Sequence, residues 1–201
     1  NPLAAVMGNL DLALKDVTDL TQRLGLSDDL MDELRDARDA AERIRTIVRD
    51  LKIFSRPEED KRAPVDARPV LESTLRMVWN EMRHRARLVE QYGDVPPVEA
   101  NESRLGQVFL NLVVNATHAI PEGRAADNEI RIATLLGTHG EVVVEIADTG
   151  SGMPPEVLRQ LFTPFFTTKP VGEGTGLGLA ICQRIVTDLG GNIEVQSELG
   201  K

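Results

Sequence analysis

The sequence predicts an α+β protein built as a helical hairpin followed by an α/β two-layer sandwich. Two observations carry this prediction. Apolar residues recur at three- and four-residue steps up to Phe54, whereas helical and strand patterns alternate from Val65 onward. A charged, proline-containing stretch without periodicity separates the two parts. We therefore expect a hairpin over 1–56, a linker over 57–64 and a second domain over 65–201.

The hairpin is expected to consist of helices over 3–24 and 30–54, each with one narrow apolar stripe. Ser27 is a suitable N-cap for the second helix, and a turn as short as 25–27 requires antiparallel helices. One hairpin alone would leave much of its stripe in water. Dimerisation into a four-helix bundle would bury the stripe; alternatively, the hairpin packs only on the rest of its own chain.

In the second domain, helical and strand patterns predict a mostly antiparallel sheet covered by helices. The expected helices cover 70–85, 103–120 and 176–189, and the expected strands cover 87–92, 129–136, 141–147 and 192–197. Trp79 and Met82 lie on an apolar helix face and are core candidates.

Composition narrows the class of protein. The 201 residues carry a formal net charge of −9, and only 3% are aromatic, so aliphatic side chains must fill the core. An acidic chain lacks the bulk positive charge of nucleic-acid binders, which argues against a nucleic-acid partner. Cys182, the single cysteine, cannot form an internal disulfide, fits a cytoplasmic location and is expected to be a small buried hydrophobe.

The sequence contains no continuous apolar run of about 18 residues, the length that a membrane-spanning helix would need. The chain starts Asn1-Pro2, without an initiator methionine, and reads as a piece of a longer protein. Membrane anchoring is therefore expected only through segments upstream of it.

Two asparagines mark the predicted helix over 103–120. Asn111 and Asn115 are four residues apart and therefore share one face of that helix. Because asparagine forms helices poorly, two on one face suggest a function, although a pair of surface amides would give the same pattern.

A glycine-containing segment follows the predicted strand over 141–147. Gly150 and Gly152 would allow close backbone approach by a ligand, but an ordinary turn would use them equally well. Asp148 emerges at the strand end. Its carboxylate could accept a hydrogen bond from the exocyclic amine of adenine, whereas guanine presents an acceptor there, which would favour ATP over GTP.

A second glycine-rich segment runs directly into an apolar helix, with alternating glycines at Gly172, Gly174, Gly176 and Gly178. Backbone N–H groups at a helix N-terminus bind phosphates without bulk positive charge, which reconciles a phosphate site with an acidic chain. The spacing is neither that of a dinucleotide fingerprint nor that of a P-loop. A flexible linker is the alternative.

Between the two glycine segments, residues 161–170 hold three of the five phenylalanines. These side chains would anchor the loop in the core or seat a mobile lid. In a lid, Thr167, Thr168 and Lys169 could reach a phosphate.

In this order and spacing, the four segments resemble the asparagine, first glycine, phenylalanine and second glycine boxes of sensor histidine kinases. The hairpin resembles the dimerisation and phosphotransfer domain of that family. The resemblance implies ATP and Mg²⁺ as cofactors, with Asn115 ligating the metal, Asn111 as a catalytic residue beside the metal and phosphates, and Asp148 binding adenine. The implied nucleotide-binding residues are Asn111, Asn115, His118, Asp148, Gly150, Gly152, Thr168, Lys169, Gly172, Gly174, Thr175, Gly176, Leu177 and Gly178.

The chain departs from the family pattern at both ends. The phosphoacceptor pattern H-E-x-x-[NT]-P would place its histidine four residues before Asn1, and none of His84, His118 and His139 fits that pattern. Asn1 matches the family's Asn or Thr that positions water for dephosphorylating the regulator, and is therefore a second catalytic candidate. The family usually continues beyond Lys201 into another strand, so we expect the last sheet element to be trimmed.

The resemblance implies transfer of the γ-phosphoryl group of ATP to a histidine and then to an aspartate on a response-regulator receiver domain, within a homodimer. Related gyrase-type ATPases carry a glutamate at the position of Asn111, where it activates water. An amide cannot take that proton, so slow hydrolysis is expected. The alternative is a pseudokinase or scaffold that docks a partner without phosphotransfer.

Overall fold

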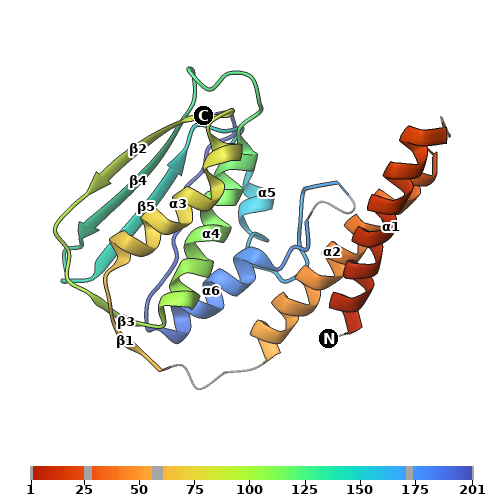
Figure 1. The fold of residues 1–201 in the computed structure, drawn as a ribbon. Coiled ribbons are helices and arrows are strands. Elements are labelled where there is room, and N and C mark those ends of the chain that lie inside the picture. Colours follow the sequence, from red (N-terminus) through yellow and green to blue (C-terminus); the bar gives the residue numbers. More distant parts are fainter. Residues whose placement is uncertain (1, 25–28, 56–60, 171–173, 201) are drawn as a thin grey trace.

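The computed structural model describes residues 2–24, 29–55, 61–170 and 174–200 (Figure 1). Helices α1 (Pro2–Leu24) and α2 (Asp29–Ser55) form the expected antiparallel hairpin. Arg38 Nε donates to Asp11 Oδ1 at 2.8 Å, which joins the two helices. The expected Ser27 cap lies outside the described residues. Within the described ranges, no helix combines the length and apolar composition that crossing a membrane requires.

The second part of the chain is a layer of helices against a sheet (Figure 1). Its elements are β1 (Ala63–Val65), α3 (Ala67–Met82), β2 (Arg87–Tyr92), β3 (Val98–Ala100), α4 (Glu102–Ala119), β4 (Glu129–Leu136), β5 (Val142–Asp148), α5 (Pro155–Leu158) and α6 (Gly178–Asp188). Helices α3, α4 and α6 lie on one side of the sheet, so the α+β two-layer prediction is confirmed for this part.

The three-stranded sheet has the order β2-β4-β5 and is mixed rather than mostly antiparallel. Strand β4 pairs antiparallel with β5, and Ile130 lies opposite Asp148. Strand β2 pairs parallel with β4, because the chain between them returns through helix α4 to the same end of the sheet. A separate antiparallel pair joins β1 to β3.

The element boundaries differ from the expected ones for local reasons. Helix α3 starts three residues earlier than expected because the Asp66 side chain caps it by accepting from Arg68 N at 2.9 Å. Strands β1 and β3 and helix α5 have only three or four residues each, too few for a periodic signal. Strand β1 also begins inside the segment expected to be the linker.

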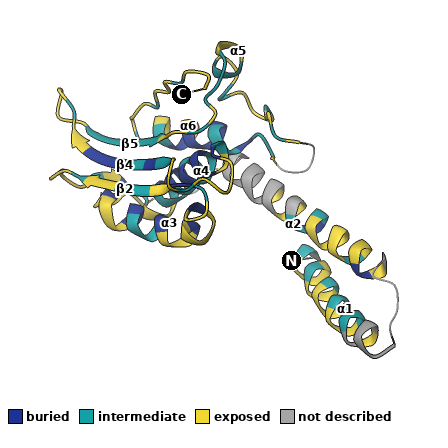
Figure 2. Cartoon of the chain, turned by 90° about the horizontal axis from the view of Figure 1, so that it is seen from above, coloured by how far each residue is buried: buried dark blue, intermediate teal, exposed yellow. Residues whose placement is uncertain are grey.

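Aliphatic side chains fill the core between helices and sheet, as the low aromatic content predicts (Figure 2). The fully buried side chains include Leu71, Met82, Val113, Ile120, Ile130, Ile132, Ile181 and Ile185. Cys182 is also fully buried, as expected. The prediction for Trp79 is wrong: its side chain is 46% exposed, because the buried stripe of α3 passes through Val78 and Met82 and position 79 lies about 100° from Val78.

The strand expected over 192–197 is not formed. Alternating Ile193 and Val195 favour extended chain, but a strand also needs a neighbour's backbone groups. The segment instead contacts the loop that follows β5. Met153 N donates to Ser197 Oγ at 2.9 Å, and Gly200 N donates to Ser151 O at 2.9 Å.

Gly152 is the tightest point of this contact. Its φ is +65°, and a Cβ there would lie 2.0 Å from the carbonyl oxygen of Glu198. Gly140, with φ +87°, has nothing within 4 Å of a Cβ and is a matched control. We expect Gly152→Ala to lower the free energy of unfolding by about 2–4 kcal/mol and Gly140→Ala by only about 1–2 kcal/mol. Urea unfolding followed by fluorescence of Trp79, the single tryptophan, measures both. Equal losses would contradict the close packing of the C-terminal segment.

Candidate functional site

Helix α4 carries both predicted asparagines on one face, and this face meets the start of α6. Asn111 Nδ2 donates to Gly178 O at 3.2 Å. A Cβ on Gly178 would lie 3.6 Å from Asn111 Cγ, in ordinary van der Waals contact with the amide. Asn115 lies one turn further along α4 and is partly buried.

The N-terminal end of α6 is tied to the phenylalanine segment. Gly176 has φ +64°, and a Cβ there would lie 2.4 Å from the carbonyl carbon of Phe165. Phe165 N donates to Gly176 O at 2.9 Å, and Phe165 itself is left-handed, with φ 68°. Thr175 Oγ1 accepts from Leu177 N at 3.3 Å as the helix begins. Any residue other than glycine at position 176 would therefore place its Cβ against backbone atoms of Phe165, not against a movable side chain.

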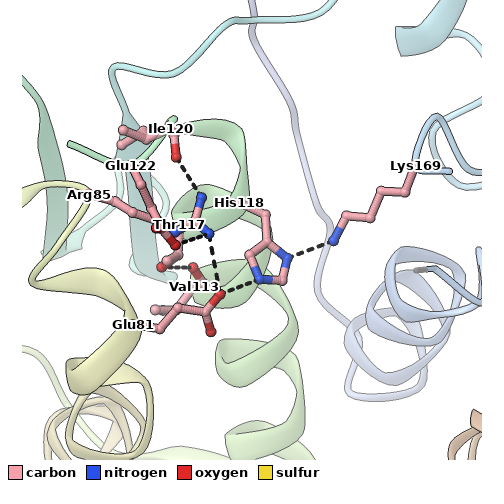
Figure 3. Close-up of polar contacts among 8 residues, drawn as sticks. All are labelled: Glu81, Arg85, Val113, Thr117, His118, Ile120, Glu122 and Lys169. Carbon is pink, nitrogen blue, oxygen red and sulfur yellow. Dashed lines mark hydrogen bonds and ion pairs between the residues drawn. The ribbon is translucent and has the colours of Figure 1, made fainter. Parts of the chain in front are cut away.

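The phenylalanine segment also reaches α4. Lys169 Nζ lies 2.7 Å from His118 Nδ1 (Figure 3). A Cβ on Gly174 would lie 2.8 Å from Thr167 Oγ1, so this segment packs closely on the second glycine segment. Thr168 is exposed. The structure thus brings the predicted Lys169 and His118 together.

Asp148 ends strand β5, and the first glycine segment folds back from it onto α4. Gly150 N donates to Asp148 Oδ1 at 2.8 Å, and Ser151 N donates to Ala119 O at 3.0 Å. A Cβ on Gly150 would lie 2.6 Å from Ala119 O. Desolvation raises the pKa of Asp148, and the Gly150 hydrogen bond partly opposes this.

Helix α4 is therefore contacted by three of the predicted segments. Among the predicted site residues, Asn1 and Gly172 lie outside the described residues. Glu81 was not predicted, although its Oε1 lies 2.6 Å from His118 Nε2. It comes from α3, where no motif marks a site, and its sequence neighbours gave no signal for it.

The donor set at this site suits a weakly chelated hard cation. Among the described residues, no group of three or more His, Cys, Asp or Glu side chains could hold a metal ion. Mg²⁺ accepts amide oxygen, retains water and shares the phosphates of its nucleotide, so it needs no carboxylate cage. The amide of Asn115 fits that requirement.

Comparison with known families identifies the domain that carries these residues. Residues 100–201 match the family described as histidine kinase-, DNA gyrase B- and HSP90-like ATPase. The chain belongs to this ATPase family. The match begins at the last residue of β3 and includes every predicted site residue except Asn1.

Individual relatives of this ATPase are sensor histidine kinases. Sensor kinase CckA of Brucella abortus is 34% identical over 212 residues, covering 100% of this chain and 22% of its own. Sensory histidine kinase/phosphatase NtrB of Rhizobium meliloti is 33% identical, covering 98% of this chain and 52% of its own. The chain thus spans about half of NtrB and less than a quarter of CckA.

A solved structure of histidine kinase ThkA in complex with response regulator protein TrrA has a TM-score of 0.64. It is 24% identical and covers 94% of this chain and 54% of its own, so it supports the fold alone. Together with the family match, the relatives confirm the resemblance: the chain contains the ATP-binding domain of a histidine kinase.

Asp148 provides a direct test of the site. An asparagine at position 148 can still accept from Gly150 N but cannot offer adenine a carboxylate. It also carries no charge to be desolvated, whereas desolvation raises the pKa of Asp148. Because that pKa is raised, ionising Asp148 costs folding free energy as pH rises through it. We expect Asp148→Asn to weaken ATP binding about 10- to 100-fold, measured by calorimetry, without lowering stability at neutral pH, measured by urea unfolding. Unchanged ATP affinity would contradict the role assigned to Asp148.

Proposed function

We propose that this chain is the core of a sensor histidine kinase, which binds Mg·ATP and transfers its γ-phosphoryl group to a histidine. The observation that carries the proposal is the convergence of three predicted segments on α4. Asn111 meets Gly178, His118 meets Lys169, and Ala119 accepts from the first glycine segment. These contacts gather an adenine acceptor, amides and a helix N-terminus around one helix.

Each group has a separate task in this proposal. Asp148 accepts from the adenine amine, while Gly150 and Gly152 shape the loop beneath it. Asn115 holds Mg²⁺, which, when bound, neutralises phosphate charge. The glycines that precede α6, including the predicted Gly172, let backbone N–H groups approach the phosphates together with Thr175 and Leu177.

The cationic side of the site completes the phosphate pocket. His118 follows Asn115 on α4 by three residues, Lys169 Nζ lies 2.7 Å from His118 Nδ1, and Thr168 belongs to the same segment as Lys169. Closure of that segment would exclude water and fix the phosphates for in-line transfer. Such transfer depends on positioning and charge neutralisation rather than on a strong base.

The receiving histidine and the regulator follow from the family resemblance. The phosphoacceptor pattern places the histidine four residues before Asn1, and Asn1 would position water for dephosphorylation. NtrB is named a kinase/phosphatase, and ThkA was solved with a response regulator. By analogy, we propose a response-regulator receiver domain as the partner of this chain.

The side chain at position 111 distinguishes the proposed kinase from an ATPase, because an amide cannot take a proton from water. In the full-length protein, label from γ-labelled ATP should appear as acid-labile phosphate on the histidine before Asn1, with little phosphate released to solution. Asn111→Glu introduces a base and should raise ATP hydrolysis at least about 10-fold. Asn111→Gln has the same length without the base and should not raise it.

Two outcomes would count against this assignment. Absence of acid-labile label from a protein that binds ATP would favour the pseudokinase alternative. Equal hydrolysis by the Glu and Gln variants would contradict the argument from the amide.

The hairpin supports a homodimer. Six large apolar side chains along it are about half or more exposed: Val6, Leu12, Leu20, Leu30, Ile44 and Val48 (Figure 2). Helix α2 contacts α6 of its own chain, but this contact does not cover these six positions. We propose that a second copy covers them in a four-helix bundle.

A charge at one of these six positions should therefore prevent dimerisation. Leu12 is 62% exposed, and Leu12→Glu would place two carboxylates in a symmetric interface, one from each chain. We expect the wild-type chain to be dimeric and the variant monomeric in size-exclusion chromatography with light scattering. Leu136→Glu is the control, since Leu136 is 54% exposed on β4, away from the hairpin. A monomeric wild type would show that the hairpin does not form the bundle.

A further inference from the structure

The imidazole ring of His118 is held from both sides. Glu81 Oε1 lies 2.6 Å from Nε2, and Lys169 Nζ lies 2.7 Å from Nδ1 (Figure 3). Glu81 comes from α3, His118 from α4, and Lys169 from the phenylalanine segment. Three segments that are distant in sequence thus meet at one ring.

The two partners together select one form of the ring. A lysine ammonium can donate hydrogen bonds but cannot accept them, so Nδ1 must present its lone pair. The proton of neutral His118 is then on Nε2, where it is donated to the Glu81 carboxylate. The opposite tautomer would direct N–H at the ammonium and a lone pair at the carboxylate, and both contacts would become repulsive.

Glu81 also lies near a cation from the turn that follows α3. Arg85 Nη2 lies 4.0 Å from Glu81 Oε1. The guanidinium donates to Ile120 O at 2.9 Å and to Glu122 Oε1 at 2.8 Å, and the Arg85 side chain is only 19% exposed. A well-anchored cation therefore lies beside the carboxylate that orients the ring.

Lys169 is oriented from its own side as well. Its backbone N donates to Thr167 Oγ1 at 3.1 Å. A Cβ on Gly174 would lie 3.4 Å from Lys169 Cδ, so the second glycine segment packs against the lysine stem. Glu81, His118 and Lys169 form what we call the His118 latch.

We propose that Glu81 is a positioning residue for nucleotide binding, which acts by keeping His118 in the Nε2–H tautomer and thereby holding Lys169 on α4. His118 is three residues after Asn115, on the same side of the helix. The latch thus holds a lysine at His118, about one helical turn from Asn115, before phosphate arrives, which reduces the ordering that binding requires. Its link to nucleotide rests on the proposed function, whereas the tautomer does not.

Nitrogen-15 NMR of the whole chain tests the tautomer without nucleotide. The sequence has three histidines, His84, His118 and His139, so replacing each in turn assigns its signals. We expect wild-type His118 to carry its proton on Nε2. Glu81→Ala should give mixed tautomers, whereas Glu81→Gln should retain Nε2–H because its amide oxygen still accepts.

ATP affinity, measured by calorimetry with Mg²⁺, should follow the tautomer. Glu81→Ala should bind ATP about two- to five-fold more weakly, the scale of an exposed charge pair, while Glu81→Gln stays near wild type. Glu122→Ala is the matched control, since Glu122 shares Arg85 with Glu81 but has no contact with the ring. We expect it to leave both measurements unchanged.

A proton on Nδ1 in the wild type, or a tautomer that Glu81→Ala does not alter, would overturn the proposal. Equal loss of ATP affinity in Glu81→Ala and Glu122→Ala would also overturn it, since the role would then be structural. If the wild type binds no ATP, the proposed function fails, and the link to nucleotide fails with it. The tautomer results would still decide whether Glu81 sets the state of His118.

Discussion

The site depends on how closely backbone approaches helix α4. At the C-terminal end of the helix, a side chain on Gly150 would meet Ala119 O at 2.6 Å; near the middle of the helix, Gly178 lies against Asn111. A larger residue at Gly150 would push its loop away from the helix. In the proposed function, this close approach would let backbone N–H groups and amides provide the phosphate contacts, so that a chain of net charge −9 needs no bulk positive charge to bind ATP.

Helix α4 also orders the groups along its axis. Asn111, Asn115 and His118 follow one another toward Ala119, and these eight residue steps span about 12 Å. Within this stretch, the Asn111 amide that meets α6 is therefore at one end, and the Ala119 carbonyl that meets the first glycine segment is at the other. The opposite face of the same helix buries Phe109 and Val113 in the core, so its polar face is held in a fixed orientation.

Sequence patterns predicted the long elements and the four motif segments because these signals are local. The α3, α4 and α6 stripes, the β4 and β5 alternation and the glycine spacing all lie within single segments. Glu81 was missed because its role exists only where α3 meets α4. The strand over 192–197 was wrongly predicted because the alternation within that segment does not show whether a neighbouring strand is present to pair with it.

Helix α6 joins the nucleotide side of the molecule to the hairpin. Its first residue accepts from Asn111, its approach is fixed by the Gly176–Phe165 contact, and the helix also contacts α2 (Figure 1). A shift at the start of α6 would therefore be felt both by the phenylalanine segment and by the hairpin, because the buried Ile181 and Ile185 make the helix move as a unit. In the proposed kinase, whose acceptor histidine would precede the hairpin helices described here, this helix would connect occupancy of the phosphate site to the placement of the acceptor.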